Sequence, residues 1–161
     1  MNEMVIQILA ATAGTVGFAI FFRVKKKHIF LAGLGGLLCW TLYLLSYHFS
    51  KSTFIASFVS SFFCSIYSEV LARLCKAPAN VFLTPSIIPL IPGGSLYYTM
   101  TSLISNDIDE FGMNARLTCA YVFGITTGIV IGAWLFRYIT HICYLMLCHM
   151  QRKKHGRIGK E

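Results

Sequence analysis

The chain has 161 residues, 56% of them hydrophobic and only 12% charged, and its formal net charge is +8. Globular proteins usually contain ~25% charged residues, so this chain has too little polar surface for a water-soluble particle, and its mean hydropathy of +0.66 agrees. Intrinsic disorder is excluded as well, because it requires low hydrophobicity and high charge. The composition therefore predicts an integral membrane protein.

The first two apolar runs predict membrane-spanning helices over residues 4–22 and 29–49. The first run is long enough to cross a ~30 Å hydrocarbon core. No basic residue precedes it, and four of the five residues 23–27 are basic. A secretory signal peptide has the opposite charge order, so we expect a retained helix with its N-terminus outside. Trp40 and Tyr47 then lie toward the outer end of the second run, where amphipathic rings favour the interface.

Three further apolar runs cover residues 53–74, 81–105 and 117–136. The fourth run is interrupted by proline and glycine, and a short acidic loop with Asp107, Asp109 and Glu110 separates it from the fifth. The five runs predict an all-α fold of about five transmembrane helices.

This pattern predicts one transmembrane domain, residues 1–150, followed by a basic cytoplasmic tail, residues 151–161. The apolar stretch 138–150 is too short to cross the membrane again. It either extends the fifth helix into the cytoplasm or lies at the interface.

The basic residues predict the orientation of these spans. Twelve of the 14 Lys and Arg residues fall in segments that five alternating spans place on one side, and only Lys51 and Arg116 fall on the other. Because positive residues stay cytoplasmic, this bias predicts N-out and C-in. Binding of nucleic acid is disfavoured, because the aromatic residues lie inside the apolar runs and not among the charges.

The fourth run contains the most informative segment for function. Pro85, Pro89 and Pro92 each remove a backbone donor, at a cost near ~3 kcal/mol in a helix interior, and Gly93-Gly94 follows directly. Broken backbone at membrane depth is tolerated only inside protein or beside a watery cavity. We expect a break here, with Ser95 capping a second half-helix whose amides suit a carboxylate.

Interrupted helices mark substrate sites in many secondary transporters. The alternative is a structural kink or a re-entrant loop without a ligand. On the transport interpretation, the predicted substrate pathway consists of Pro85, Pro89, Pro92, Gly93, Gly94, Ser95, Tyr97 and Tyr98.

Glu69 is the only acidic residue inside a predicted span, and such residues are functional candidates by default. It lies roughly 24 Å along its helix from the outer end, near the cytoplasmic boundary. Arg73 follows at the i+4 spacing that favours an ion pair. Two interpretations stay open: a role in ion coupling, and a plain ion pair with Arg73.

Gly124, Gly128 and Gly132 give the fifth run a flat face that lets another helix approach closely. The sequence does not tell whether that helix lies in this chain or in another. Together with the small size and the odd span number, we take this face as an indication of a partner subunit. No metal-ligand spacing, cofactor motif or catalytic motif is present, so we expect no cofactor, no metal and no enzymatic activity.

Several short stretches are distinctive: Ala77-Pro78, Val81-Phe82-Leu83, Pro85, Ile87-Ile88-Pro89-Leu90, Pro92-Gly93-Gly94 and Tyr97-Tyr98, with 52–57 and 67–73 upstream. They resemble the threonine/serine exporter (ThrE) family, specifically its small half, the YjjB-like subunit. The resemblance is specific from about Ser52 to Met100 and hydropathic elsewhere. It brings no established site residues with it.

The resemblance implies a larger five-span membrane subunit as partner, or the two halves fused in one chain. It also implies export of threonine and serine or, in one branch, of succinate. Two five-span halves in inverted orientations would build a site at the bilayer midplane. We therefore expect one half of a two-subunit secondary exporter for small hydrophilic carboxylates, chiefly hydroxy-amino acids, in the cytoplasmic membrane. The alternatives are a succinate exporter and a non-transporting scaffold or regulatory subunit.

Overall fold

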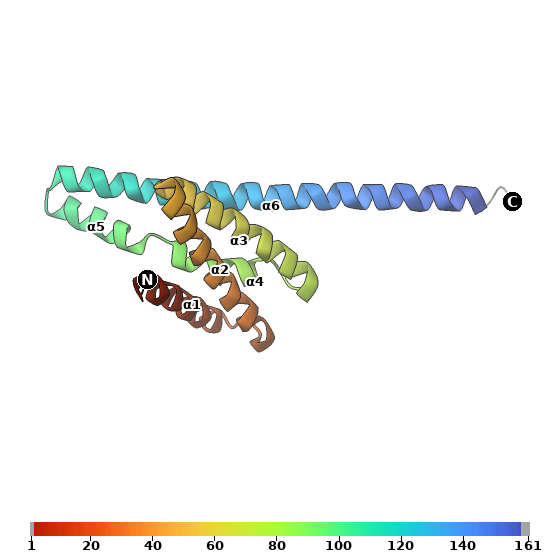
Figure 1. Ribbon diagram of the computed structural model, residues 1–161, viewed down its shortest axis with the longest axis horizontal. Helices are drawn as coiled ribbons and strands as arrows, with labels where there is room; N and C mark the ends of the chain where they lie inside the picture. The colour runs from red at the N-terminus through yellow and green to blue at the C-terminus, as the bar shows by residue number, and fades with distance from the viewer. Residues whose placement is uncertain (1, 159–161) are drawn as a thin grey trace.

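The computed structural model describes residues 2–158, with side-chain burial for residues 3–143 and 146. Over this range the regular structure is entirely helical (Figure 1). The elements in chain order are α1 (Asn2–Phe21), α2 (Lys26–Ser50), α3 (Thr53–Cys75), α4 (Asn80–Ile87), the short 3-10 helix η1 (Ile88–Leu90), α5 (Gly93–Ile104) and α6 (Ile108–Ile158). The predicted all-α fold is confirmed.

Four of the described helices, α1, α2, α3 and α6, are long and apolar enough to cross a membrane. The pair Asn80–Leu90 and Gly93–Ile104 passes the same test together but is bent by 52°. The described part of the chain therefore holds four spans, or five if the bent pair is one span.

Helix α6 begins nine residues earlier than the predicted fifth span, at Ile108. The prediction of an acidic loop is wrong here, because Asp109 and Glu110 lie in the first turn of α6. The side chain of Asp107 accepts a hydrogen bond from the amide of Glu110 at 3.1 Å, as an N-terminal cap does. The two acids of the first turn suit the positive end of the helix.

At its other end α6 continues through residues 138–150 to Ile158. This stretch was expected either to extend the fifth helix or to lie at the interface, and in the structure it extends the helix. No boundary interrupts α6 at position 150, so residues 151–158 of the predicted tail are helical, and residues 159–161 lie outside the described residues. With 51 residues, α6 is about 77 Å long at 1.5 Å per residue.

The glycine face of α6 packs against α3 of the same chain. A Cβ atom added at Gly124 would lie 2.7 Å from the Phe54 carbonyl oxygen, and one at Gly128 would lie 2.6 Å from that of Phe58. Only glycine allows so close an approach of the two backbones. The face is therefore used within this chain, and it no longer argues for a partner subunit.

Helices α3 and α6 run parallel in one register. Ser57, Ser61 and Ser65 of α3 meet Gly124, Gly128 and Gly132 of α6, each pair 67 positions apart. The hydrogen bond between Arg73 and Thr140 keeps the same offset near the C-terminal end of α3. Because both helices point the same way, the segment between them, α4 to α5, must lead the chain from the C-terminal end of α3 back toward its N-terminal end.

The buried core lies between α2, α3 and η1, where Cys39, Tyr43, Ala56, Cys64 and Leu90 form one cluster. Tyr43 is also 2.6 Å from the hydroxyl oxygen of Tyr121, which connects α2 to α6. This core holds α3 in place between α2 and α6.

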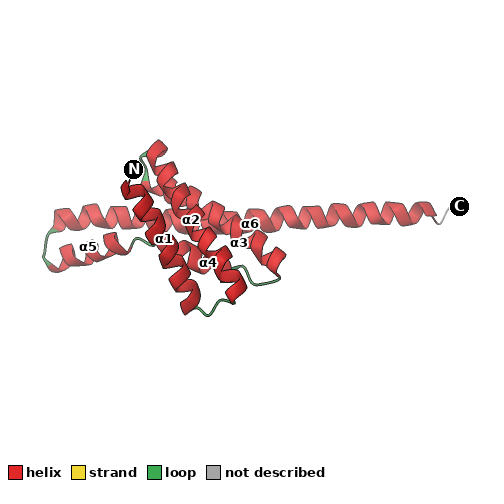
Figure 2. Ribbon diagram, turned by 60° about the horizontal axis from the view of Figure 1, so that its bottom comes forward, coloured by secondary structure: helices red, strands yellow, loops and turns green. Residues whose placement is uncertain are grey.

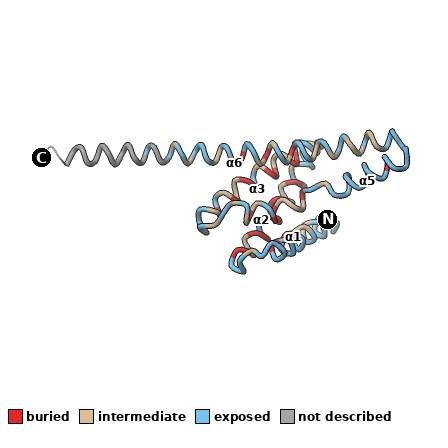
Figure 3. The backbone as a smooth tube through the Cα atoms, turned by 180° about the vertical axis from the view of Figure 1, so that it is seen from behind, coloured by how far each residue is buried: buried red, intermediate tan, exposed pale blue. Residues whose placement is uncertain are grey.

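Helix α5 lies outside this core. It packs mainly against the first part of α6, and the two project as a hairpin to one side of α1, α2 and α3 (Figure 2). Most of α5 is exposed (Figure 3), including Leu96, Met100, Leu103 and Ile104. A surface this apolar requires lipid or another protein as its neighbour.

Candidate functional site

The break between α4 and α5 is built from backbone and proline. Helix α4 ends at Ile87, η1 follows, and Pro92 occupies the N-cap position of α5 with φ −78° and ψ 61°. The Gly93 amide donates to the Ile91 carbonyl at 2.8 Å. Among the described residues, the amides of Gly94 and Ser95 have no acceptor. Two backbone donors at the positive end of α5 are thus available.

Ser95 does not cap α5, contrary to the prediction. The N-cap position lies three residues earlier, at Pro92, and the helix begins at Gly93. The hydroxyl of Ser95 donates to the Pro92 carbonyl at 3.2 Å and accepts from Thr118 at 3.1 Å. Its observed role is to connect α5 to α6.

The other predicted pathway residues differ in exposure. Pro85 is buried within α4, and Pro89 and Pro92 are half-buried. Tyr97 and Tyr98 are 67% and 60% exposed, with their rings edge-to-face at 5.6 Å. The tyrosines are therefore accessible to a molecule outside this chain, whereas Pro85 is not.

Gly93 and Gly94 are exposed, and a Cβ atom at either would meet nothing within 4 Å. Neither has a positive φ. Neither packing nor backbone conformation within the described chain therefore requires glycine at these positions. Three cavities of the described residues, of about 830, 630 and 360 Å³, have no lining residue between 89 and 98. Ile91, Gly93 and Gly94 of the break are thus exposed on the surface of the described chain.

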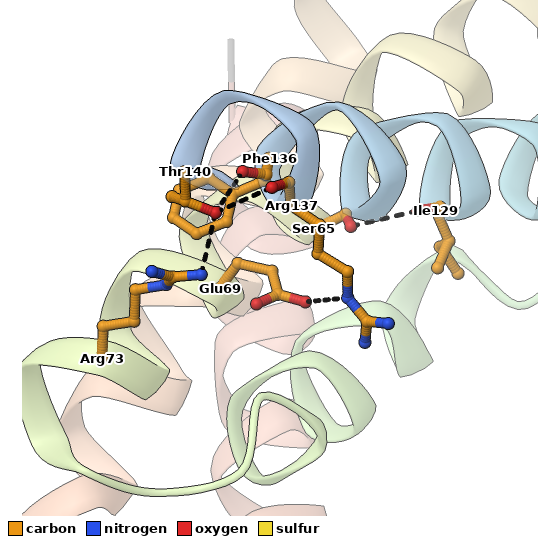
Figure 4. A network of polar contacts seen from close by, with 7 residues as sticks. All are labelled: Ser65, Glu69, Arg73, Ile129, Phe136, Arg137 and Thr140. Carbon is orange, nitrogen blue, oxygen red and sulfur yellow. Dashed lines mark hydrogen bonds and ion pairs between the residues drawn. The ribbon is translucent and has the colours of Figure 1, made fainter. Parts of the chain in front are cut away.

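The second predicted feature, Glu69, lies on α3 opposite α6 (Figure 4). Its Oε1 atom is 3.9 Å from Nε of Arg137, and the two side chains are 15% and 77% exposed. Arg73 points elsewhere: it donates to Thr140 Oγ1 at 3.0 Å and lies 4.9 Å from the centre of the Phe136 ring. The predicted pair of Glu69 and Arg73 is not formed, because the register of α3 and α6 brings Arg137 to Glu69.

A cavity of about 360 Å³ adjoins this pair, between α3, the start of α4, and α6. It is lined by Ser65, Ser68, Glu69, Pro78, Ala79, Asn80, Leu83, Ile129, Ala133 and Arg137. The sequence alone did not identify Arg137 and Asn80 as candidate site residues. The glycine and serine repeats, each with a spacing of four residues, are the signal that would have paired α3 with α6. Within the described residues, no three His, Cys, Asp or Glu side chains are grouped as a metal site would require.

Comparison with known families gives the class of the chain. The family model for "Threonine/Serine exporter, ThrE" matches residues 7–135. The match includes α1 from Gln7 onward, α2 to α5, and α6 as far as Leu135, which is well over half of the chain. The chain belongs to the threonine/serine exporter family.

A relative of this exporter-family chain is an uncharacterized protein of Haemophilus influenzae, 26% identical over 137 residues. The matched region is 84% of this chain but 46% of that protein, so the chain spans about half the length of the curated relative. No solved structure matches the chain. Family membership and the long apolar helices together indicate a multi-pass membrane protein of an exporter family.

Proposed function

We propose that this chain is one half of a two-subunit secondary exporter in the cytoplasmic membrane, with threonine and serine as substrates. The observation that carries the proposal is the family match over residues 7–135. The length of the Haemophilus influenzae relative supports the idea of two halves, because this chain matches 46% of it. A transporter, and not an enzyme, is the activity that follows.

The parallel register of α3 and α6 supports five spans. If both helices cross the membrane in the same direction, the chain between them must cross back once. The bent pair of α4 and α5 then acts as a single broken span, and a re-entrant loop is disfavoured. An odd span number agrees with N-out and C-in, the orientation that the basic residues predict.

Cysteine labelling tests this topology. In a chain freed of native cysteines, an impermeant thiol reagent added outside cells is expected to modify a cysteine at Asp109 and to spare one at Lys154. The reason is that cytoplasmic segments carry the excess of Lys and Arg. Permeabilised cells provide the control, in which both positions react. Labelling of both positions in intact cells, or of Lys154 alone, would contradict the orientation.

In this proposal the break at Pro89 to Ser95 binds the substrate carboxylate. The free amides of Gly94 and Ser95 and the positive end of α5 favour an anionic group. Because Gly93 and Gly94 are exposed in this chain, another chain would complete the site. The larger subunit, placed against α5, would supply those walls and cover the exposed apolar residues of α5.

The lone chain is therefore expected to transport nothing. Purified alone into liposomes, it should move threonine, serine or succinate no faster than empty liposomes do. The complex that co-purifies with a tagged copy from membranes should export threonine under the same conditions. Robust transport by the lone chain, as a homodimer for example, would show that a second kind of subunit is not needed.

Succinate is the second candidate substrate, and one observation favours it. The cavity of about 830 Å³ beside the turns at residues 22–25 and 76–79 is lined by Arg23, Lys25, Lys27 and Lys76. Such a basic cavity attracts a dianion more strongly than a zwitterion. Competition of unlabelled succinate against labelled threonine separates the two candidates.

A further inference from the structure

The carboxylate of Glu69 is largely buried yet lacks a hydrogen bond from any described residue. Its ion-pair partner among the described residues is Arg137, whose Nε is 3.9 Å from Oε1, beyond hydrogen-bonding distance. By contrast, four of the five buried serines of α3, Ser60, Ser61, Ser65 and Ser68, donate to backbone carbonyls. At 15% exposure the carboxylate keeps some contact with solvent, and its oxygens are free to accept hydrogen bonds from a bound group.

The cavity beside Glu69 has room for such a group. Its volume of about 360 Å³ falls in the range of about 300–1,000 Å³ typical of small-molecule sites. Glu69 and Arg137 project toward each other from α3 and α6 across one part of its wall (Figure 4). Negative and positive groups thus face one cavity, separated by a gap that no hydrogen bond closes.

Polar atoms complete the lining. The hydroxyls of Ser65 and Ser68 donate to the carbonyls of Ile129 and Cys64, at 3.2 and 2.8 Å, which leaves their oxygens free to accept. Asn80, at the first turn of α4, adds an exposed amide side chain that both donates and accepts. A ligand with an ammonium group, a carboxylate and a hydroxyl would find a partner for each in this cavity.

We propose that this cavity is a loading site for the amino-acid zwitterion, in which Glu69 binds the α-ammonium group and Arg137 binds the α-carboxylate. The inference rests on the proposed export function and adds a site distinct from the break at Pro89 to Ser95. A zwitterion has no net charge, so it replaces the long ion pair without adding charge to the cavity. Glu69 and Arg137 lie near the end of α3 that the topology places in the cytoplasm, where export begins.

Chemical variants of the substrate test each half of the site separately. The complex is purified through a tagged copy of the full chain that carries Gly94→Val, in which the break no longer binds a carboxylate, and it is assayed for equilibrium binding of labelled threonine. N-acetylthreonine, which lacks the ammonium group, and threonine amide, which lacks the carboxylate, serve as competitors. This reference complex should bind each of them about tenfold to a hundredfold more weakly than threonine, the expected loss for one charged hydrogen-bonding partner.

In Glu69→Gln, threonine should lose that advantage over N-acetylthreonine but keep it over threonine amide. Arg137→Gln should show the reverse pattern. Arg73→Gln is the matched control: it removes a positive charge from the same region but not from the cavity, so it should keep both preferences. The Arg137 side chain is 77% exposed, so Arg137→Gln is expected to fold. It therefore tests the site even if Glu69→Gln fails to fold.

Unchanged preferences in Arg137→Gln would overturn the loading site. The loading site would also be overturned if Glu69→Gln kept both binding preferences while export lost its dependence on the ion gradient. That result would assign Glu69 to ion coupling alone. In both cases a wild-type complex that exports threonine leaves the proposed function standing. A wild-type complex that neither binds nor exports threonine or serine overturns the proposed function together with this site.

Discussion

Gly94→Val is expected to abolish export while the chain still folds and assembles with its partner. A Cβ atom at Gly94 meets nothing within 4 Å in the described chain, and valine is tolerated better than glycine in a helix. The added methyl groups would instead stand between the substrate carboxylate and the amides of Gly94 and Ser95. Two lost hydrogen bonds to a charged group, at about 1.5–3 kcal/mol each, reduce affinity roughly a hundredfold or more.

The measurement is export of labelled threonine by the reconstituted variant, with co-purification of the partner as the check on assembly. Gly14→Val is the matched control, because Gly14 is an exposed glycine of α1 whose added Cβ also meets nothing within 4 Å. It should export as the wild type does. Ser95→Ala removes the hydroxyl's hydrogen bonds with Pro92 and Thr118 but leaves the amides of Gly94 and Ser95 open, so it should be milder than Gly94→Val. Wild-type export by Gly94→Val would exclude the break as the substrate site.

Gly128→Ala is expected to destabilise the protein strongly, although it adds a single methyl group. That carbon would lie 2.6 Å from the Phe58 carbonyl oxygen and 3.0 Å from the Phe62 amide nitrogen, and nearer still to the Ser61 hydroxyl. Because two of these three contacts are with backbone, α3 and α6 must separate. Overpacking of this kind costs about 1–3 kcal/mol, which lowers the melting temperature by roughly 3–10 °C for a chain of this size.

Thermal unfolding of the purified protein in detergent measures this effect. Gly17→Ala in α1 is the control, since a Cβ atom there meets nothing within 4 Å, and it should unfold at or above the wild-type temperature. An unchanged melting temperature in Gly128→Ala would contradict the packing of α3 on α6. The same separation would move Arg137 away from Glu69, so the variant should also bind threonine more weakly.

The helices themselves could be predicted from hydropathy, because a long apolar run in a membrane has few other ways to satisfy its backbone. The expected run 53–74 corresponds to α3, Thr53–Cys75, and 29–49 corresponds to α2, Lys26–Ser50. The start of α6 was missed because charged residues were assigned to a loop. The spacing of Asp107 and Glu110 is that of a capping pair, in which the Asp side chain accepts from the amide three residues later.

The contacts of the candidate site could not be predicted in the same way. The i+4 spacing of Glu69 and Arg73 is a local signal, whereas the pairing of Glu69 with Arg137 depends on how two distant helices align. That alignment is set by glycines of α6 meeting serines of α3, so it requires knowing which helices are neighbours. The role of Ser95 was predicted wrongly for a similar reason, since its partner Thr118 lies on another helix.

Counterflow in proteoliposomes tests the central claim, that this chain is half of a threonine and serine exporter, most directly. The complex is purified through a tagged copy of the chain and reconstituted into liposomes that are loaded with unlabelled threonine. Uptake of labelled threonine is then followed without any ion gradient. The account predicts a transient accumulation of label that unlabelled serine abolishes and that liposomes with the lone chain do not show. A properly assembled complex that gives no accumulation with threonine or serine would contradict the account.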